Sequence, residues 1–208
     1  MTGVASISVS VPCRRWLTRL PGARALCRKA AAAAFEIGAD SALPGALTGA
    51  LPGALTGRGS FEVSLVLGDD DFVRALNCTY RGRDAATNVL AFGNFTAPEA
   101  VNPASSRRRS AAMTSTAMTS TAMTGDGEKP VLLGDVVIAY ETVVAEALAQ
   151  RKSIEAHLCH LVVHGVLHLL GYDHEDETDA LRMERIEATV LGQLGLPDPY
   201  RLESAASD

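Results

Sequence analysis

The five histidines of this 208-residue chain lie within eighteen positions of one another, at His157, His160, His164, His168 and His174. Residues four apart share one face of an α-helix, so His164 and His168 are expected to point the same way, about one turn apart. The surrounding sequence predicts a helix that is capped by Ser153 and ends at Gly171, because glycine readily takes the left-handed conformation that ends helices. The chain is then expected to fold back and bring His174 beside the other two.

We predict that three of these side chains hold one zinc ion per chain: His164, His168 and His174. Three neutral nitrogen ligands at about 2.0–2.1 Å leave the fourth position of a tetrahedral ion for water, which is typical of catalytic zinc. His157 and His160, higher on the helix, are expected to pack or to support the ligands. Acids beside the third ligand are candidate hydrogen-bond acceptors for the ligand rings, namely Asp173, Glu175 and Asp176.

Residues 164–174 read HGVLHLLGYDH, which matches every ligand and glycine position of the zinc-protease pattern HExxHxxGxxH. The one departure is Gly165, which stands where a protease has its glutamate general base. Glycine has no side chain that could deprotonate a metal-bound water. The segment therefore has the ligand spacing of a protease without its base.

Other segments alternate between strand-like and helix-like patterns. Apolar alternation or β-branched runs predict strands over 4–11, 61–67, 87–92 and 131–139. Helical spacing predicts helices over 14–37, 69–77, 142–150, 153–170 and 178–194. The first helix is expected to stop at Gly38. This order, without strict βαβ repetition, favours the α+β class: a single domain with a mixed β-sheet of about four strands packed against helices, and a metal site at the end of a central helix.

Two low-complexity segments interrupt this pattern. Residues 42–57 read ALPGALTG twice, and residues 113–124 repeat MTSTA within an irregular stretch over 94–129. Proline, glycine, serine and threonine bury too little apolar surface to offset the entropy lost on ordering. We therefore expect one domain over 1–208 with flexible insertions at about 42–57 and 94–129. The run Arg107–Arg109 either touches RNA or, as we favour, is a solvated charge cluster.

The composition indicates a cytoplasmic protein. The net charge of −5 argues against a broad nucleic-acid-wrapping surface, so any RNA contact has to be a local patch. The longest apolar stretch, 158–172, is too short and too polar to span a bilayer, and Arg14 comes too late for a secretory signal. The cysteines have no CxxC spacing and are expected to be free thiols: Cys13, Cys27, Cys78 and Cys159.

Three separated blocks resemble one known family, the YbeY-type endoribonucleases or bacterial rRNA maturation factors. The histidine block at 164–174 resembles the family signature, and it is the most specific of the three. The sequence LNCTYRGRDAATNVLAF at 76–92 resembles the family segment LNxxYRxxDxxTxVLSF, and LGDVVI at 133–138 resembles its LGDI-type strand. Departures are AFG at 91–93 in place of SFP, the ALPGALTG duplication and the long 94–129 stretch.

The resemblance implies a zinc-dependent endoribonuclease that cleaves single-stranded RNA in small-subunit rRNA 3′-end maturation and ribosome quality control. Its partners would be RNA, the small ribosomal subunit and assembly factors. By matching position, the three histidines would be the ligands and Arg81 the catalytic basic residue. From the residues alone, Arg81 either stabilises charge on phosphate oxygens or forms a salt bridge, for example with Asp84. Tyr80 either stacks on a base or belongs to the core.

Three hypotheses on function remain open at this point. The first is a zinc endoribonuclease. The second is a zinc peptidase or amidase, against which Gly165 argues. The third is a non-catalytic ribosome-assembly factor whose zinc only fixes the end of the helix. Cleavage of RNA, cleavage of peptides, and co-purification with ribosomal particles without RNA cleavage distinguish them in that order.

Overall fold

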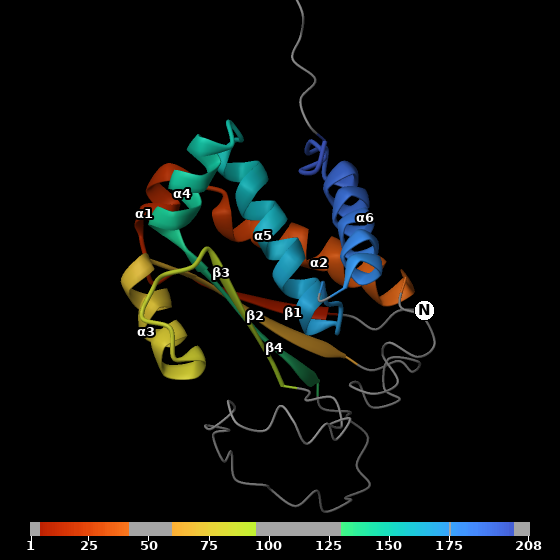
Figure 1. Cartoon of the computed structure of the whole chain (residues 1–208), viewed down its shortest axis with the longest axis horizontal. Coiled ribbons are helices and arrows are strands. Elements are labelled where there is room, and N and C mark those ends of the chain that lie inside the picture. Colours follow the sequence, from red (N-terminus) through yellow and green to blue (C-terminus); the bar gives the residue numbers. More distant parts are fainter. Residues whose placement is uncertain (1–4, 42–59, 95–129, 175, 202–208) are drawn as a thin grey trace, which may run out of the picture.

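The computed structural model describes residues 5–41, 60–94, 130–174 and 176–201, and in these ranges it contains four strands and six helices (Figure 1). In chain order they are β1 Ala5–Ser10, α1 Arg15–Arg19, α2 Ala23–Ser41, β2 Phe61–Gly68, α3 Asp70–Arg81, β3 Val89–Gly93, β4 Val131–Ala139, α4 Tyr140–Ala149, α5 Ile154–Leu169 and α6 Glu177–Gln193. The predicted α+β class is confirmed. The first repeat segment, nearly all of the second insertion and the Arg107–Arg109 run lie outside the described residues.

The four strands form one mixed sheet in the order β1-β2-β4-β3. Strands β1, β2 and β4 are parallel, and β3 runs antiparallel to β4 with Ala91 opposite Val136. Among the parallel strands, β4 is apolar along most of its length, whereas β1 and β2 alternate, and every second residue of β2 from Phe61 to Leu67 is buried. Because β3 is last in this order, it is an edge strand among the described strands, and it borders the part of α5 that carries the histidines.

Helices cover both faces of the sheet (Figure 1). The larger core lies between one face and helices α2, α5 and α6, and it takes alternate residues of β2, such as Val63, Leu65 and Leu67, together with Val136 of β4. A smaller cluster under α3 covers the opposite face, with Val73, Leu90, Val137 and Ala139. On this face α5 packs against β3 and β4, α2 packs beside it against β1, and α6 packs against both helices, which fixes the histidine-bearing turns.

Two details of the first predicted helix were wrong. The segment is broken into α1 and α2 at Pro21, because proline lacks the N–H that a continuous helix needs and restricts Leu20 before it. Gly38 does not stop α2 but lies inside it, facing α5. A Cβ atom at Gly38 would lie 2.8 Å from side-chain atoms of both Leu167 and Leu170, so this glycine permits close helix packing rather than termination.

The four cysteines are free, as expected: Cys13, Cys27 and Cys159 are buried and Cys78 is exposed. Burial raises the pKa of both Cys27 and Cys159 to about 12, so their thiols stay protonated at neutral pH. Within the described part of the chain, no helix combines the length and apolar character needed to cross a bilayer.

Candidate metal centre

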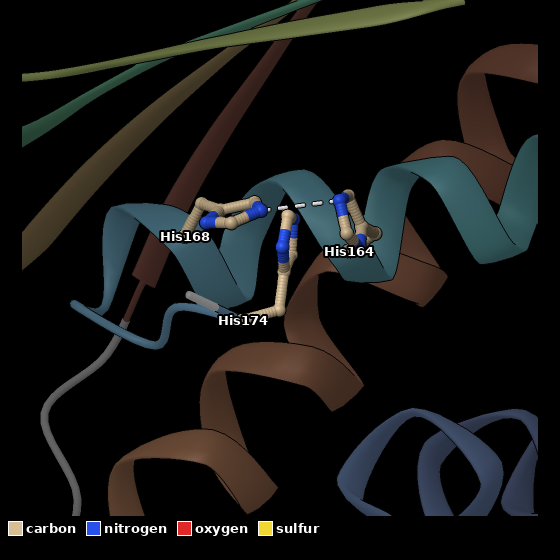
Figure 2. Close-up of side chains that lie close together, drawn as sticks. All are labelled: His164, His168 and His174. Atoms are coloured by element: carbon tan, nitrogen blue, oxygen red, sulfur yellow. Dashed lines mark hydrogen bonds between the residues drawn. The ribbon is translucent and has the colours of Figure 1, made fainter. Parts of the chain in front are cut away.

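Helix α5 places His164 and His168 on one face, one turn apart. The helix begins after Ser153, whose side chain accepts a hydrogen bond of 3.0 Å from the Ala156 backbone N–H, so the expected N-cap is confirmed. The ring centroids of His164 and His168 are 4.5 Å apart, and their Nε2 atoms face each other at 3.1 Å (Figure 2).

The turn after α5 reverses the chain at Gly171. Its φ of 87° lies in the left-handed region, which glycine adopts without a steric penalty. The Tyr172 N–H donates to the carbonyl of Leu167 at 3.0 Å and closes the helix end. The Tyr172 hydroxyl donates to the carbonyl of Gly38 at 2.7 Å, which fastens the turn to α2. The reversal that the sequence predicted is therefore held by a long-range contact as well.

This turn brings His174 to the two helix histidines. Its ring centroid is 5.7 Å from that of His164 and 5.1 Å from that of His168 (Figure 2). One nitrogen of each ring lies within 4.8 Å of the others, and no second such group of metal-binding side chains occurs among the described residues. Nitrogen ligands of one tetrahedral ion are about 3.3–3.4 Å apart, so the facing Nε2 atoms are near the spacing that one ion needs.

Hydrogen bonds behind the rings decide which nitrogen faces the cluster. Nδ1 of His164 donates to Oε1 of Glu187 at 2.8 Å, and Nδ1 of His168 donates to the carbonyl of Tyr172 at 3.0 Å. Two Nε2 lone pairs then face each other, an arrangement that is repulsive unless a cation lies between them. Burial, together with the adjacent His164 and His174, lowers the pKa of His168 to about 4, so this ring is neutral at pH 7. The donor set therefore fits a metal ion.

Glu187 of α6 is a supporting residue that the sequence analysis missed. Its fully buried carboxylate accepts hydrogen bonds from Nδ1 of His164 at 2.8 Å, from Nε2 of His160 at 3.0 Å and from the hydroxyl of Tyr200. Burial alone would raise the pKa of this carboxyl, but the three donors outweigh it and lower the pKa to about 2. The side chain is therefore ionised and orients the His164 ring.

A signal for Glu187 was present in the sequence. Met183, Ile186 and Val190 form the apolar stripe of α6, and Glu187 falls within that stripe rather than on the solvent face. A glutamate in such a position is almost never fully buried unless it has a partner. The mismatch between residue type and helix face thus indicates a polar contact, although it does not name the partner.

The acids proposed as partners of the ligand rings have other roles. Asp173 accepts a hydrogen bond of 2.7 Å from the backbone N–H of His174. Asp176 is the N-cap of α6 and accepts from the Asp179 N–H at 2.9 Å. Both carboxylates therefore accept hydrogen bonds from nearby backbone N–H groups, Asp173 in the turn and Asp176 at the start of α6. Glu175 lies outside the described residues.

The two remaining histidines lie outside the three-histidine cluster. Nε2 of His157 is 2.8 Å from Oε2 of Glu146, and burial lowers the pKa of His157, so it is a neutral buried ring. His160 shares Glu187 with His164, and its ring also meets that of His164 edge to face at a centroid distance of 6.4 Å. Their positions agree with packing and supporting roles.

A cavity of about 360 Å³ opens beside the three histidines. Besides the histidines, it is lined by Arg81, Asn88, Val89, Ala91 and Gly165. The lining comes from the end of α3, from the edge strand β3 with Asn88 just before it, and from the face of α5 with His174 in the turn that follows. The wall opposite the histidine face is thus made by the sheet edge and by a guanidinium.

Arg81 is the last residue of α3, and it is exposed on the cavity. Gly82 follows with a φ of 65° and ends the helix in the left-handed conformation. The salt bridge considered between Arg81 and Asp84 is not found, because Asp84 is bound by Arg74 through two hydrogen bonds of 2.6 and 2.9 Å. Tyr80 is 48% exposed rather than a core residue, although one side of its ring contacts Phe92 of β3, with ring centroids 5.2 Å apart.

Gly165 marks the closest approach of α5 to the sheet. A Cβ atom at this position would lie 2.5 Å from Cγ1 and 3.0 Å from Cγ2 of Val136. Real Cβ atoms do not approach other carbons so closely, so any side chain requires the helix or β4 to move. The absence of a protease-type glutamate therefore has a packing reason as well as a chemical consequence.

We expect Gly165→Ala to lower the free energy of unfolding by about 1–3 kcal/mol, the usual cost of overpacking a core. This loss would occur although alanine in a helix normally gains about 1 kcal/mol over glycine. Gly192→Ala in α6 is the matched control, because a Cβ there meets nothing within 4 Å. Denaturant unfolding of both variants measures the difference. A Gly165→Ala protein as stable as Gly192→Ala contradicts the close approach.

Glu187→Gln is expected to weaken metal binding about 10–100-fold, the range for residues that orient a ligand from behind. Glutamine keeps the size of the side chain but loses the charge that favours donation from Nδ1 of His164. Competition with a chromophoric chelator measures the affinity, and thermal unfolding of the metal-free protein is followed in parallel. Glu184→Gln, on the same helix, is the control. Equal metal affinity in wild type and Glu187→Gln would argue against the orienting role.

Comparison with known proteins decides the family. The family model described as Endoribonuclease YbeY matches residues 48–195, which is well over half of the chain. The chain belongs to the YbeY endoribonuclease family. The matched range contains all three clustered histidines, Arg81 and Glu187.

Relatives of this family extend the similarity over most of the chain. A protein of Paramagnetospirillum magneticum named Endoribonuclease YbeY is 40% identical over 201 residues, covering 96% of this chain and 98% of the relative. Its namesake in Rhodospirillum rubrum is 43% identical over 185 residues, covering 89% of this chain and 76% of the relative. The Endoribonuclease YbeY of Magnetococcus marinus is 46% identical over 140 residues, covering 67% of this chain and 82% of the relative. The resemblance expected from the three sequence blocks is confirmed.

Proposed function

We propose that this protein is a zinc-dependent endoribonuclease that cleaves single-stranded RNA. We further propose that it acts in the cytoplasm on the 3′ end of small-subunit rRNA and in ribosome quality control, with the small subunit and assembly factors as partners. Family membership supports the reaction class. The observation that carries the proposal is that Arg81 and the three histidines line the same cavity.

His164, His168 and His174 would hold the zinc ion, one per chain. When bound, zinc supplies a Lewis acid for a phosphoryl oxygen and lowers the pKa of a bound water to about 7. Glu187 and the carbonyl of Tyr172 keep the His164 and His168 rings in the tautomer that presents Nε2 to the cavity. The protein thereby holds the ligand nitrogens ready before any substrate arrives.

Arg81 would bind the substrate phosphate. A guanidinium is permanently charged and forks onto two phosphate oxygens, so it stabilises the negative charge that grows on them as the phosphodiester is cleaved. Its position at the end of α3, across the cavity from α5, places it on the substrate side of the histidine cluster. Arg81 is our candidate catalytic residue.

One feature favours the peptidase alternative. The edge strand β3 contributes Val89 and Ala91 to the cavity wall, and a sheet edge can align an extended peptide by backbone pairing. The sequence had given no indication of such an edge. Against it, none of the described residues that line the cavity carries a carboxylate. The general base of a zinc peptidase is therefore missing, and RNA remains the better-supported substrate.

The test is to incubate protein of defined zinc content with single-stranded RNA, with the matching duplex, and with a peptide mixture. We expect cleavage of the single strand only, abolished by a chelator and restored by zinc. Peptide cleavage instead would support the peptidase. Association with ribosomal particles without any RNA cleavage would support a non-catalytic assembly factor with a structural zinc.

A further inference from the structure

A second cavity of about 240 Å³ adjoins the metal cavity and has no role in the chemistry above. Asn88, Val89 and His164 line both cavities, so the two are continuous along the side of α5 that faces β3. Typical sites for drug-sized ligands measure about 300–1,000 Å³, so this smaller space suits one ring system rather than a second large molecule. A nucleotide whose phosphate occupied the metal cavity would have this space beside it, because the two cavities share a wall.

The charges of the second cavity differ from those of the first. The metal cavity contains Arg81, whereas the described residues that line the second cavity include no lysine or arginine and include the carboxylate of Glu146. Glu187, directly behind His160 and Tyr200, adds a second negative charge nearby. A phosphate would be repelled from this space. A neutral group that donates hydrogen bonds would not.

One wall of the second cavity is aromatic. The rings of His160 and Tyr200 meet edge to face at 5.7 Å with an interplanar angle of 84°, and Leu161 adds an apolar surface. Tyr200 is 42% exposed, and its hydroxyl is fixed on Glu187, so the ring stands in a set position. Aromatic side chains stack on bases of any kind, which makes this wall suitable for a nucleobase.

Glu146 supplies the polar edge of the cavity. Its Oε1 accepts from Nδ2 of Asn88 at 3.2 Å, and its Oε2 accepts from Nδ2 of Asn88 at 3.0 Å and from Nε2 of His157 at 2.8 Å. A carboxylate has about four lone-pair positions, so one on Oε1 stays available. The side chain is held in place and is 32% exposed. It can therefore accept one more N–H from a ligand.

We propose that this cavity is a nucleobase subsite, resting on the proposed function, that selects a base with an exocyclic amino group beside the scissile phosphate. Adenine, cytosine and guanine each carry an amino N–H that Glu146 can accept. Uracil carries carbonyl oxygens where these bases carry the amino group, and its N3–H lies between two such oxygens, so presenting that donor to Glu146 brings a carbonyl oxygen toward the carboxylate as well. The subsite thus disfavours uridine at one nucleotide next to the cleaved bond.

Single-turnover cleavage of oligo(A), oligo(C) and oligo(U) tests the subsite, together with an oligomer of purine riboside, which is adenosine without its amino group. We expect kcat/KM about tenfold higher on oligo(A) and oligo(C) than on oligo(U), the scale of one hydrogen bond to a charged acceptor. The purine riboside oligomer should fall to the level of oligo(U). Glu146→Gln should lose this preference, because the amide replaces one acceptor by a donor.

The control is Glu155→Gln, an exposed glutamate of α5 that lines neither cavity and should keep the preference. Equal rates of wild type on all four RNAs, or a Glu146→Gln loss that is the same for each, would overturn the subsite. Binding of cytidine and uridine monophosphate to the zinc-loaded protein gives a readout without cleavage. Tighter binding of the cytidine nucleotide that depends on Glu146 supports the subsite even if no RNA is cut, and equal binding of the two overturns it.

Discussion

Replacing His164 and His168 together by alanine is expected to reduce the zinc content from about one ion per chain to essentially none. These two rings supply the facing Nε2 atoms at 3.1 Å, and His174 alone cannot retain an ion against water. Elemental analysis after gel filtration measures the content. RNA cleavage by the double variant should fall below detection under the same conditions, because zinc is then absent from the cavity.

The control for this experiment is His157→Gln, which changes a histidine of the same helix that lies outside the cluster. It should keep about one zinc ion per chain, since none of the three ligands is altered. Full zinc retention in the double alanine variant would show that the ion is held elsewhere. Loss of zinc in His157→Gln would show that the content reports the packing of α5 rather than the three ligands.

Arg81→Ala is expected to keep the zinc and the fold but to slow RNA cleavage about a hundredfold, the scale of losing one group that stabilises developing oxyanion charge. Arg81 is exposed at the end of α3, and Asp84, the salt-bridge partner considered from the sequence, is bound by Arg74. Truncation therefore removes a substrate contact without breaking that pair. Arg81→Lys should recover only part of the rate, because lysine keeps the charge but loses the fork.

Single-turnover cleavage of a single-stranded RNA, with the zinc content determined in every variant, measures this effect. Arg83→Ala is the matched control, an exposed arginine two positions further on that does not line the metal cavity. A general loss of positive charge would slow both variants alike. Unchanged cleavage by Arg81→Ala would show that this residue does not stabilise the charge on the phosphate oxygens.

Much of the centre could be read from the sequence because its interactions are local. The spacing of His164 and His168, the cap at Ser153 and the reversal at Gly171 depend on neighbours within four residues, where helix geometry is regular. The strands were recognised for a similar reason, since the alternation in β1 and β2 and the apolar run in β4 are patterns of neighbouring residues. Pro21 is a local signal of the same kind: it indicates the break between α1 and α2, although the predicted helix over 14–37 ran through it.

Tertiary structure alone decided the residues that act across the chain. Nothing in the sequence shows that Glu187 meets His164 or that Gly38 lies under α5, and only the family resemblance placed Arg81 with the histidines. Each of these contacts depends on how whole elements pack, and residue types at both ends are compatible with several packings. The sequence alone predicted the three-histidine cluster and the order of elements, because short-range geometry dictates both. The orientation of the ligands, the guanidinium across the cavity and the close approach at Gly165 exist only once α3, α5, α6 and the sheet are in contact.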